Sequence, residues 1–214
     1  MGDESFPVEN FGTDFLTRGR VGDGPPSCPF GLLPDWAIRQ YVSITPFEEG
    51  IKRPGKISYG VTSYGYDCRL GNKYKIFSNL TPWSCDGIID PKDIREEQFA
   101  HHEGDFCVIP PNSYVLAESF ERFEIPNDVC GICMGKSTYA RCGLIVNVTP
   151  LEPGWKGYVT IEISNASPVP AKVYSFEGIM QVQFHRASPC DKTYETKGGK
   201  YQNQIGLTLP TVDK

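Results

Sequence analysis

The side chains best suited to chemistry gather in one stretch of the chain. Lys136, Ser137 and Thr138 are adjacent. Arg141 follows one helical turn later, so a short helix would bring its guanidinium to the side of the hydroxyls. Such groups bind polyphosphate oxygens through charge-assisted hydrogen bonds. Further along, Glu162 is a single carboxylate in an apolar strand, which suits proton transfer. Together they indicate an enzyme that acts on a nucleotide without a protein-bound metal.

Both features also have an ordinary structural explanation. The cation and hydroxyls could form a solvated turn that caps a short helical segment. In the sequence GYVTIEISN, alternation places Val159, Ile161 and Ile163 on one face and Glu162 on the other. An antiparallel strand with one wet face accounts for that pattern. The functional alternative is a carboxylate in a partly desolvated pocket, with its pKa raised enough to accept and return a proton near neutrality.

Two familiar catalytic motifs are absent. A phosphate-binding loop of the GxxxxGK[ST] type needs a glycine five positions before Gly135, but Cys130 stands there. No long amphipathic helix follows, so ATP hydrolysis is not expected. A serine hydrolase would carry its nucleophile in a G-x-S-x-G turn, which the chain lacks.

Metal-binding patterns are lacking as well. Zinc deaminases use H-x-E and P-C-x-x-C motifs. Among His101, His102 and His185, only His101 begins an H-x-E, with Glu103, and no P-C-x-x-C occurs to complete a zinc site. Cys130 and Cys133 lie three residues apart in an apparent strand, so their sulfurs point to opposite faces and cannot share a metal ion. The histidines are expected in loops or on the surface, and the thiols in structural positions. No zinc site is predicted.

Composition narrows the class of protein. The chain has 214 residues and a net charge of −5, which argues against a general affinity for nucleic acid because such binding needs a basic surface. No apolar run is long enough to span a bilayer, and the acidic N-terminus lacks the apolar core of a signal peptide. A cytoplasmic protein without membrane contact is expected, with its 8 cysteines reduced.

The remaining pattern is typical of a mainly β protein. With 22 glycines and 18 prolines, the chain is rich in turns. Many short segments have the composition of strands, which favours a barrel or double-sheet fold over a parallel α/β sheet. These segments are 58–70, 73–78, 105–110, 113–120, 122–126, 129–134, 143–148, 157–165, 171–175 and 178–185.

Three regions are distinguished along the chain. Residues 1–30 have little periodicity and are interpreted as an extended or partly ordered N-terminal extension. Residues 31–188 are interpreted as the β domain that holds the active site, and a short helix is predicted near its start, at 33–41. Residues 189–214 are polar and are interpreted as a C-terminal lid or tail, with a Gly-Gly pair as its hinge.

Longer motifs point to a family. They include LPDWAIR, ISYGVTSYGYDCRL, GKSTYARCGLIVNVTPLEPGW, GYVTIEISN and GGKYQNQIGLTLP, and the matching segments cover about residues 31–210. On these segments the chain resembles the dCTP deaminases of the trimeric dUTPase-like superfamily. The resemblance implies a dUTPase-like distorted β-barrel or jelly-roll with a few short helices, in a homotrimer with active sites between subunits. It also implies hydrolytic deamination of dCTP to dUTP and ammonia, with Mg²⁺ carried by the triphosphate rather than held by the protein.

The resemblance assigns catalytic roles to three residues. Glu162 would be the general base and acid that activates water for attack at C4 of cytosine. Ser137 would help to hold that water, and Arg141 would order the site. Contacts to the nucleotide are implied for Lys136, Thr138, Val148, Thr149, Pro150, Glu152, Trp155, Tyr194, Lys200 and Gln204. Within that set, Lys136 and Thr138 would meet the triphosphate, and the three tail residues would close over the phosphates.

Other activities stay open on the sequence alone. In dUTPases an aspartate precedes a base-stacking tyrosine and a glycine, and the matching positions here are Glu152, Trp155 and Gly157. A dUTPase, or a bifunctional enzyme that converts dCTP to dUMP and diphosphate, is therefore a second reading of the motif. The sequence also permits a C5-modified dCTP as substrate. A non-catalytic, regulatory nucleotide-binding trimer is a further alternative.

Overall fold

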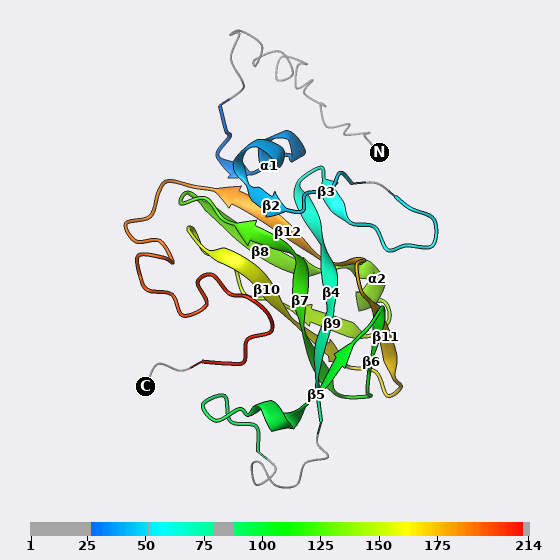
Figure 1. The fold of residues 1–214 in the computed structure, drawn as a ribbon. Coiled ribbons are helices and arrows are strands. Elements are labelled where there is room, and N and C mark those ends of the chain that lie inside the picture. Colours follow the sequence, from blue (N-terminus) through cyan, green and yellow to red (C-terminus); the bar gives the residue numbers. More distant parts are fainter. Residues whose placement is uncertain (1–26, 51, 79–87, 212–214) are drawn as a thin grey trace, which may run out of the picture.

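The structure is a computed structural model that describes residues 27–50, 52–78 and 88–211. Within these residues two short α-helices, α1 (Asp35–Tyr41) and α2 (Ser137–Ala140), and the 3-10 turn η2 (Glu96–Gln98) interrupt a chain of strands. The strands are β1 (Gly31–Leu32), β2 (Ser43–Thr45), β3 (Gly60–Thr62), β4 (Gly65–Phe77), β5 (Phe99–Glu103), β6 (Phe106–Ile109), β7 (Tyr114–Glu124), β8 (Val129–Gly135), β9 (Leu144–Asn147), β10 (Lys156–Asn165), β11 (Ala171–Tyr174) and β12 (Gly178–Arg186). The mainly β architecture predicted from the sequence is confirmed (Figure 1).

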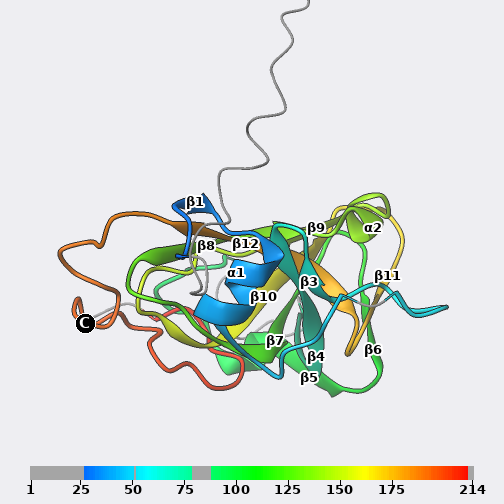
Figure 2. The ribbon, with the colours of Figure 1, turned by 90° about the horizontal axis from the view of Figure 1, so that it is seen from above.

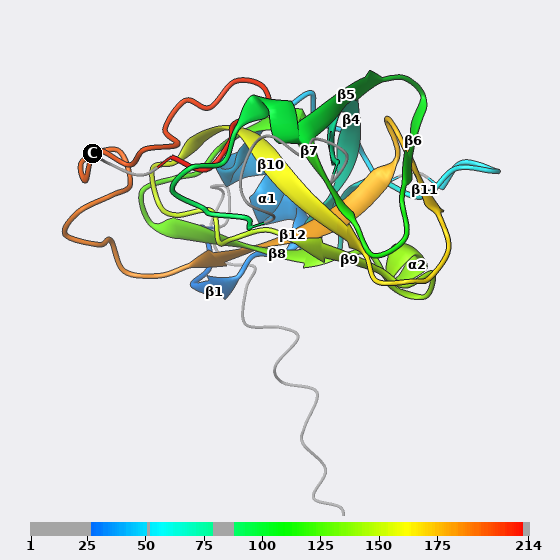
Figure 3. The ribbon, with the colours of Figure 1, turned by 90° about the horizontal axis from the view of Figure 1, so that it is seen from below.

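Most strands belong to one curled antiparallel sheet. Its strands follow the order β1-β12-β4-β7-β10-β9, with β2 beside β7, β3 and β5 beside β4, and β8 beside β12. The strands β6 and β11 form a separate pair. Seen from above and from below, the sheet wraps around the core as a half-barrel, with α1 across one end (Figure 2, Figure 3). Because β4 has neighbours on both sides along its length, it joins the two halves of the sheet.

The core is built from strand side chains that alternate between a buried and a more exposed face. On β10, Val159, Ile161 and Ile163 are at most 3% exposed, while the residues between them are less buried. This confirms the alternation predicted for the segment. The predicted helix is confirmed as α1, where Pro34 precedes the first turn and Ile38 is fully buried against the core.

Strand β4 is longer than predicted. The segments 58–70 and 73–78 are expected as separate strands, but they form the hairpin of β3 with one continuous β4. Gly71 does not turn the chain. A Cβ on Gly71 would stand 3.0 Å from the backbone carbonyl oxygen of Glu118, so this glycine allows close packing between β4 and β7.

Strand β7 is also continuous, although the sequence predicts a break between 113–120 and 122–126. A register irregularity separates its pairing with the two halves of β10. The Ser119 hydroxyl closes this bulge, since it donates to the Glu121 carbonyl at 2.6 Å and accepts from the Val159 amide at 2.8 Å. Glu121 is left fully buried.

The short strands β1, β2 and β5 have no predicted counterpart. In β5 only Phe99 is buried, so no alternation marks the segment. His101 and His102, expected on the surface or in loops, are exposed but lie within this strand. His185 is half-buried on β12. The predicted N-terminal extension lies outside the described residues, except for 27–30.

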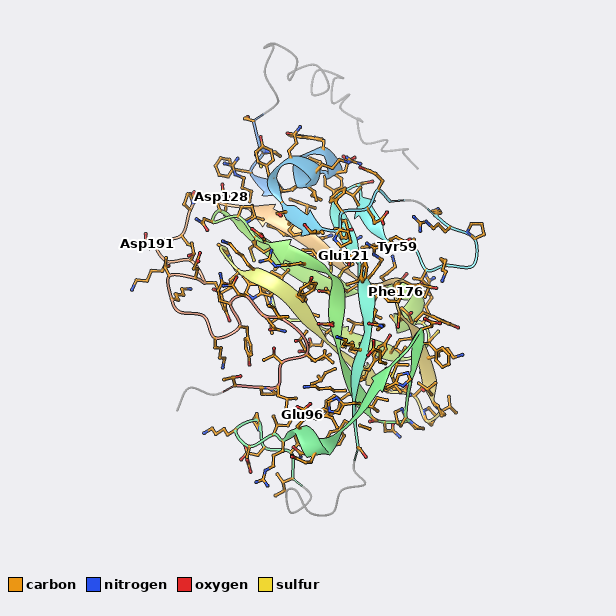
Figure 4. All side chains as sticks on the ribbon, in the orientation of Figure 1. Tyr59, Glu96, Glu121, Asp128, Phe176 and Asp191 are labelled. Carbon is orange, nitrogen blue, oxygen red and sulfur yellow. The ribbon has the colours of Figure 1, made fainter. Side chains whose placement is uncertain are left out.

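A buried ion pair joins the central strands β4 and β7. Arg69 Nε donates to Glu121 Oε1 at 2.6 Å, and the Arg69 amide donates to Oε2 at 2.8 Å. Glu121 is 0% and Arg69 6% exposed, and the guanidinium lies over the rings of Tyr59 and Phe120. Glu121 and Tyr59, which both contact Arg69, are labelled in Figure 4. Burial raises the pKa of Glu121, and the guanidinium opposes that shift.

Removing one partner of this pair should destabilise the fold strongly. Glu121→Gln leaves the buried Arg69 guanidinium with only the partly exposed Glu48, at 3.3 Å, as a counter-charge, which should lower the free energy of unfolding by about 3 kcal/mol. Asp128→Asn is the matched control, because it breaks the partly exposed Arg186–Asp128 pair (2.7 Å) and should have a much smaller effect. Urea unfolding measures both. Equal losses in the two variants would contradict a special role for the buried pair.

Candidate active site

A cavity of about 610 Å³ lies between β10, β7, the loop after β9 and the C-terminal tail. Every predicted site residue from Val148 onward lines it, Glu162 among them. The lining residues are Ile94, Tyr114, Leu116, Val148, Thr149, Pro150, Leu151, Glu152, Trp155, Val159, Thr160, Glu162, Tyr194, Lys200, Tyr201, Gln204, Thr208 and Pro210. The cavity has the size and the mostly apolar wall of a small-molecule site with a few polar groups.

Glu162 reaches this cavity from the outward face of β10. Its neighbours across the sheet are Leu116 of β7 and Asn147 of β9. Burial raises the pKa of the carboxyl to about 7, and a backbone hydrogen bond opposes the shift only in part. Among the described residues no cation acts on this pKa. A carboxyl of this kind can both accept and return a proton near neutral pH.

The C-terminal tail lies against β10 (Figure 1, Figure 3), and its residues line one side of the cavity. The Asn203 amide donates to the Lys156 carbonyl at 2.8 Å, and the Tyr158 amide donates to the Gln204 carbonyl at 3.0 Å. The Gln204 side-chain amide also donates to the Thr160 hydroxyl. Backbone groups of β10 and of the tail thus hold the tail in place.

Gly157 makes this close approach possible. A Cβ at this position, where φ is +150°, would stand 2.9 Å from the Gln204 amide nitrogen, so a side chain would displace the tail. Trp155 gives a second anchor. Its side chain is largely buried, and its indole N–H donates to the Tyr201 carbonyl at 2.9 Å. Trp155 is therefore both a cavity wall and a support for the tail.

The Gly-Gly pair of the tail forms a tight turn. Gly198 has a φ of +67°, and the Gly199 amide donates to the Tyr194 carbonyl at 2.9 Å. A Cβ on Gly199 would overlap the Tyr194 ring at 2.1 Å. The pair therefore packs directly against a cavity residue. Its role as a hinge stays a prediction.

Glu152 and Lys200 lie at the rim of the cavity. Glu152 pairs with Lys197 at 3.5 Å, with both side chains about half exposed. Lys200 Nζ donates to the Thr211 carbonyl at 2.6 Å. Both contacts are exposed and contribute little to stability. An anion could therefore displace Glu152 from Lys197 and the Thr211 carbonyl from Lys200.

The predicted phosphate-binding turn lies at α2, outside this cavity. The Arg141 amide donates to the Ser137 carbonyl at 3.1 Å, which confirms the short helical turn. Ser137, Thr138 and Arg141 are exposed, and none of them lines the cavity. Within one chain, the structure does not bring these groups together with Glu162.

Lys136 is engaged within its own chain. Its ammonium forms an ion pair with Asp67 and donates to the Ser58 hydroxyl at 3.1 Å, and the Lys136 side chain is only 11% exposed. The Gln181 side-chain amide donates to the second oxygen of Asp67 at 3.1 Å. Contact between Lys136 and a triphosphate, which stays a prediction, would have to compete with Asp67.

Several lining residues have no role in the sequence-based prediction. Tyr114 and Leu116 share one face of β7, but the sequence does not reveal that β7 pairs with β10 in the register that brings them to Glu162. Ile94 comes from a loop without periodicity. Thr160 is the exception, since alternation already places it on the face of Glu162.

The described residues contain no metal-ligand cluster and no membrane-spanning helix. Within 27–50, 52–78 and 88–211, no group of three or more histidine, cysteine or acidic side chains could hold a metal ion. Cys130 and Cys133 lie on β8 as predicted, and all cysteines in the described part of the chain are free thiols. No helix in that part is long and apolar enough to cross a membrane.

The fold has a counterpart among solved structures. The crystal structure of 2'-deoxycytidine 5'-triphosphate deaminase from Agrobacterium tumefaciens aligns with a TM-score of 0.53 at 18% sequence identity. The alignment covers 74% of this chain and 48% of that chain. The likeness establishes the fold class, a dCTP deaminase-type β fold.

Sequence relatives define the family. The family described as dCTP deaminase-like matches residues 32–187. A dCTP deaminase of Acidobacterium capsulatum is 56% identical over 170 residues, which are 79% of this chain and 91% of that protein. A dCTP deaminase of Anaplasma phagocytophilum is 50% identical over 186 residues, 85% of this chain and 98% of its own length. The chain belongs to the dCTP deaminase-like family, and the resemblance found in the sequence is confirmed.

The raised pKa of Glu162 should make stability depend on pH. The folded protein binds this proton more tightly than the unfolded chain, so stability falls as the pH rises from about 4.5 to about 7. Glutamine carries no charge, so Glu162→Gln should be more stable than the wild type at pH 8, by about 2 kcal/mol once residual solvent contact is allowed for. At pH 4 the two should be equally stable. Urea unfolding at both pH values measures this, and a difference independent of pH would contradict the burial of the carboxyl.

Proposed function

We propose that this protein deaminates dCTP to dUTP and ammonia, with Glu162 as the proton-transfer group. The observation that carries the proposal is a carboxyl with a pKa of about 7, unpaired among the described residues, in a cavity closed by the tail. Membership of the dCTP deaminase-like family supports the substrate, because relatives at 50% identity and above carry the name dCTP deaminase.

The chemistry needs one group that takes a proton and gives it back. The Glu162 carboxylate accepts a proton from water as the water oxygen bonds to C4 of cytosine. It then returns that proton to N3, which gives a tetrahedral centre. The same carboxylate then carries the proton of the new C4 hydroxyl to the amino group. The bond between C4 and this nitrogen breaks, ammonia departs, and a carbonyl remains at C4, which gives uracil. A pKa near the working pH favours both directions of transfer.

The groups of α2 are proposed to reach this carboxylate from a neighbouring subunit. Ser137 and Arg141 are exposed on α2 and do not line the cavity of their own chain. Apolar side chains are exposed on the adjoining strands, namely Ile132 and Met134 on β8 and Ile145 on β9. A homotrimer that covers these side chains would supply Ser137 to hold the water and Arg141 to order the site.

The triphosphate is proposed to lie between α2 and the tail. Thr138 and the rim residue Lys200 offer exposed donors, and Lys136 would join them after release from Asp67. Mg²⁺ would arrive with the phosphates, because it retains water and usually binds through phosphate oxygens. The tail, with Tyr194 and Gln204, would act as the lid. The expected cytoplasmic location stays a prediction.

Glu162→Gln should abolish ammonia release while dCTP still binds. The amide keeps the size of the side chain but cannot take the proton, so the rate should fall by about 10²–10⁴ or more. Ammonia release from dCTP measures the reaction, and calorimetry measures binding. Turnover by the variant at the wild-type rate would refute the role of Glu162.

Product analysis of the wild-type reaction separates the alternative functions. Formation of dUTP and ammonia supports deamination alone, whereas dUMP and diphosphate would show the bifunctional activity that Glu152, on the same cavity, leaves open. Parallel assays with CTP, dCMP and C5-substituted dCTP test which sugar, how many phosphates and which base the enzyme accepts. Binding of dCTP with no product would instead identify a regulatory protein.

A mixture of two inactive variants should recover activity if sites are shared between subunits. In random trimers of Glu162→Gln and Arg141→Ala chains, about a quarter of the sites would combine an intact glutamate with an intact arginine from the neighbour. Refolding the two chains together and assaying dCTP deamination measures the recovery, with each variant refolded alone as the control. No recovery in trimers shown to be mixed would mean that both residues act within one chain.

A further inference from the structure

The distal tail, residues 205–211, forms a wall of the cavity that holds Glu162. Thr208 and Pro210 both line this cavity. The tail up to Gln204 is fixed by the backbone hydrogen bonds to β10 described above. Beyond Gln204 these bonds stop, so the position of the distal tail needs another explanation.

A single hydrogen bond links the distal tail to the body of the protein, within the described residues. Lys75 Nζ on β4 donates to the Leu207 carbonyl at 3.1 Å. The other hydrogen bonds of the segment are internal to the tail, such as the one between the Thr211 amide and the Tyr201 hydroxyl at 3.2 Å. The hydrogen bond from Lys75 therefore fixes the position of the distal tail, and with it the position of this wall of the cavity.

The surroundings of Lys75 hold its ammonium in place. Its side chain is only 12% exposed, and Nζ lies 2.9 Å and 3.0 Å from the two carboxylate oxygens of Glu96, which is labelled at η2 in Figure 4. Glu96 is itself 3.0 Å from His101 Nε2. Across the sheet Lys75 pairs with Leu116, which in turn pairs with Glu162. The ammonium thus stands on the face of the sheet that carries the cavity, two strands from the catalytic carboxyl.

We propose that Lys75 is a positioning residue that latches the distal tail over the cavity, with Glu96 as its anchor. The side chain has no role in proton transfer. It keeps Thr208 and Pro210 in the wall, so that the cavity stays closed around the nucleotide while the carboxylate works. The effect on catalysis rests on the proposed function, whereas the latch itself is a property of the fold and is testable without substrate.

The first test is physical and compares two lysines of β4. Lys75→Met keeps an unbranched side chain that is one atom shorter and removes the donor. Lys73→Met is the matched control, because Lys73 is exposed on the same strand, makes no hydrogen bond to the tail and changes the net charge equally. Thermolysin, which cuts before bulky apolar residues, should cleave before Leu207 roughly tenfold faster in Lys75→Met than in Lys73→Met, the factor expected for one charge-assisted hydrogen bond. Cleavage products are identified by mass spectrometry.

The second test is kinetic. Lys75→Met should raise the KM for dCTP roughly tenfold with a smaller loss in kcat, because closure over the nucleotide is weakened and Glu162 is retained. Lys75→Arg, which keeps the charge and the donors, should restore both cleavage resistance and KM. Equal cleavage and equal KM in the Lys75→Met and Lys73→Met proteins would overturn the latch. A wild-type protein that forms no product from dCTP would overturn the proposed function alone, since the cleavage comparison would still decide on the latch.

Discussion

The site depends on the period of two along β10. The strand must turn Val159, Ile161 and Ile163 into the core, so Glu162 has only the opposite face available. That face is covered by the tail, which Gly157 admits to within backbone contact of the strand. The geometry that stabilises the sheet therefore also withdraws the carboxyl from water and raises its pKa to about 7. No neighbouring carboxylate is required for this shift.

Charged groups in this chain fall into two sets with different tasks. Arg69, Lys75 and Lys136 are largely buried in ion pairs with acidic partners, and they connect strands, the tail and α2 to the sheet. Arg141 and Lys200 are exposed and free of such internal partners in acidic side chains, among the residues described. A nucleotide would therefore contact the exposed cations. The buried cations hold the surrounding elements in place, and preorganised groups of this kind lose little entropy when a ligand binds.

Sequence patterns predicted the parts of this structure that local chemistry controls. Alternation located Glu162 on its face, and Pro34 with its apolar neighbours marked α1. Patterns did not predict what depends on pairing between distant segments. The register that brings Leu116 to Glu162 and the bulge closed by Ser119 arise only when β7 meets β10. Family resemblance named the tail as a lid, but Lys75 could not be found that way, since one lysine among several on β4 carries no distinguishing signal.

The tail is held through its main chain and through the side chains of Gln202 and Gln204. Its amides and carbonyls bond to β10, to the Trp155 indole and to Lys75, and these bonds take no account of which side chains the tail carries. Closure and ligand recognition are consequently separable in this fold. Substitutions at tail positions that face the cavity could change its inner surface without altering the bonds that hold the tail, provided that Gln202, Gln204 and the glycine at position 157 are kept. The same attachment to β10 could therefore hold tails that present different side chains to the cavity.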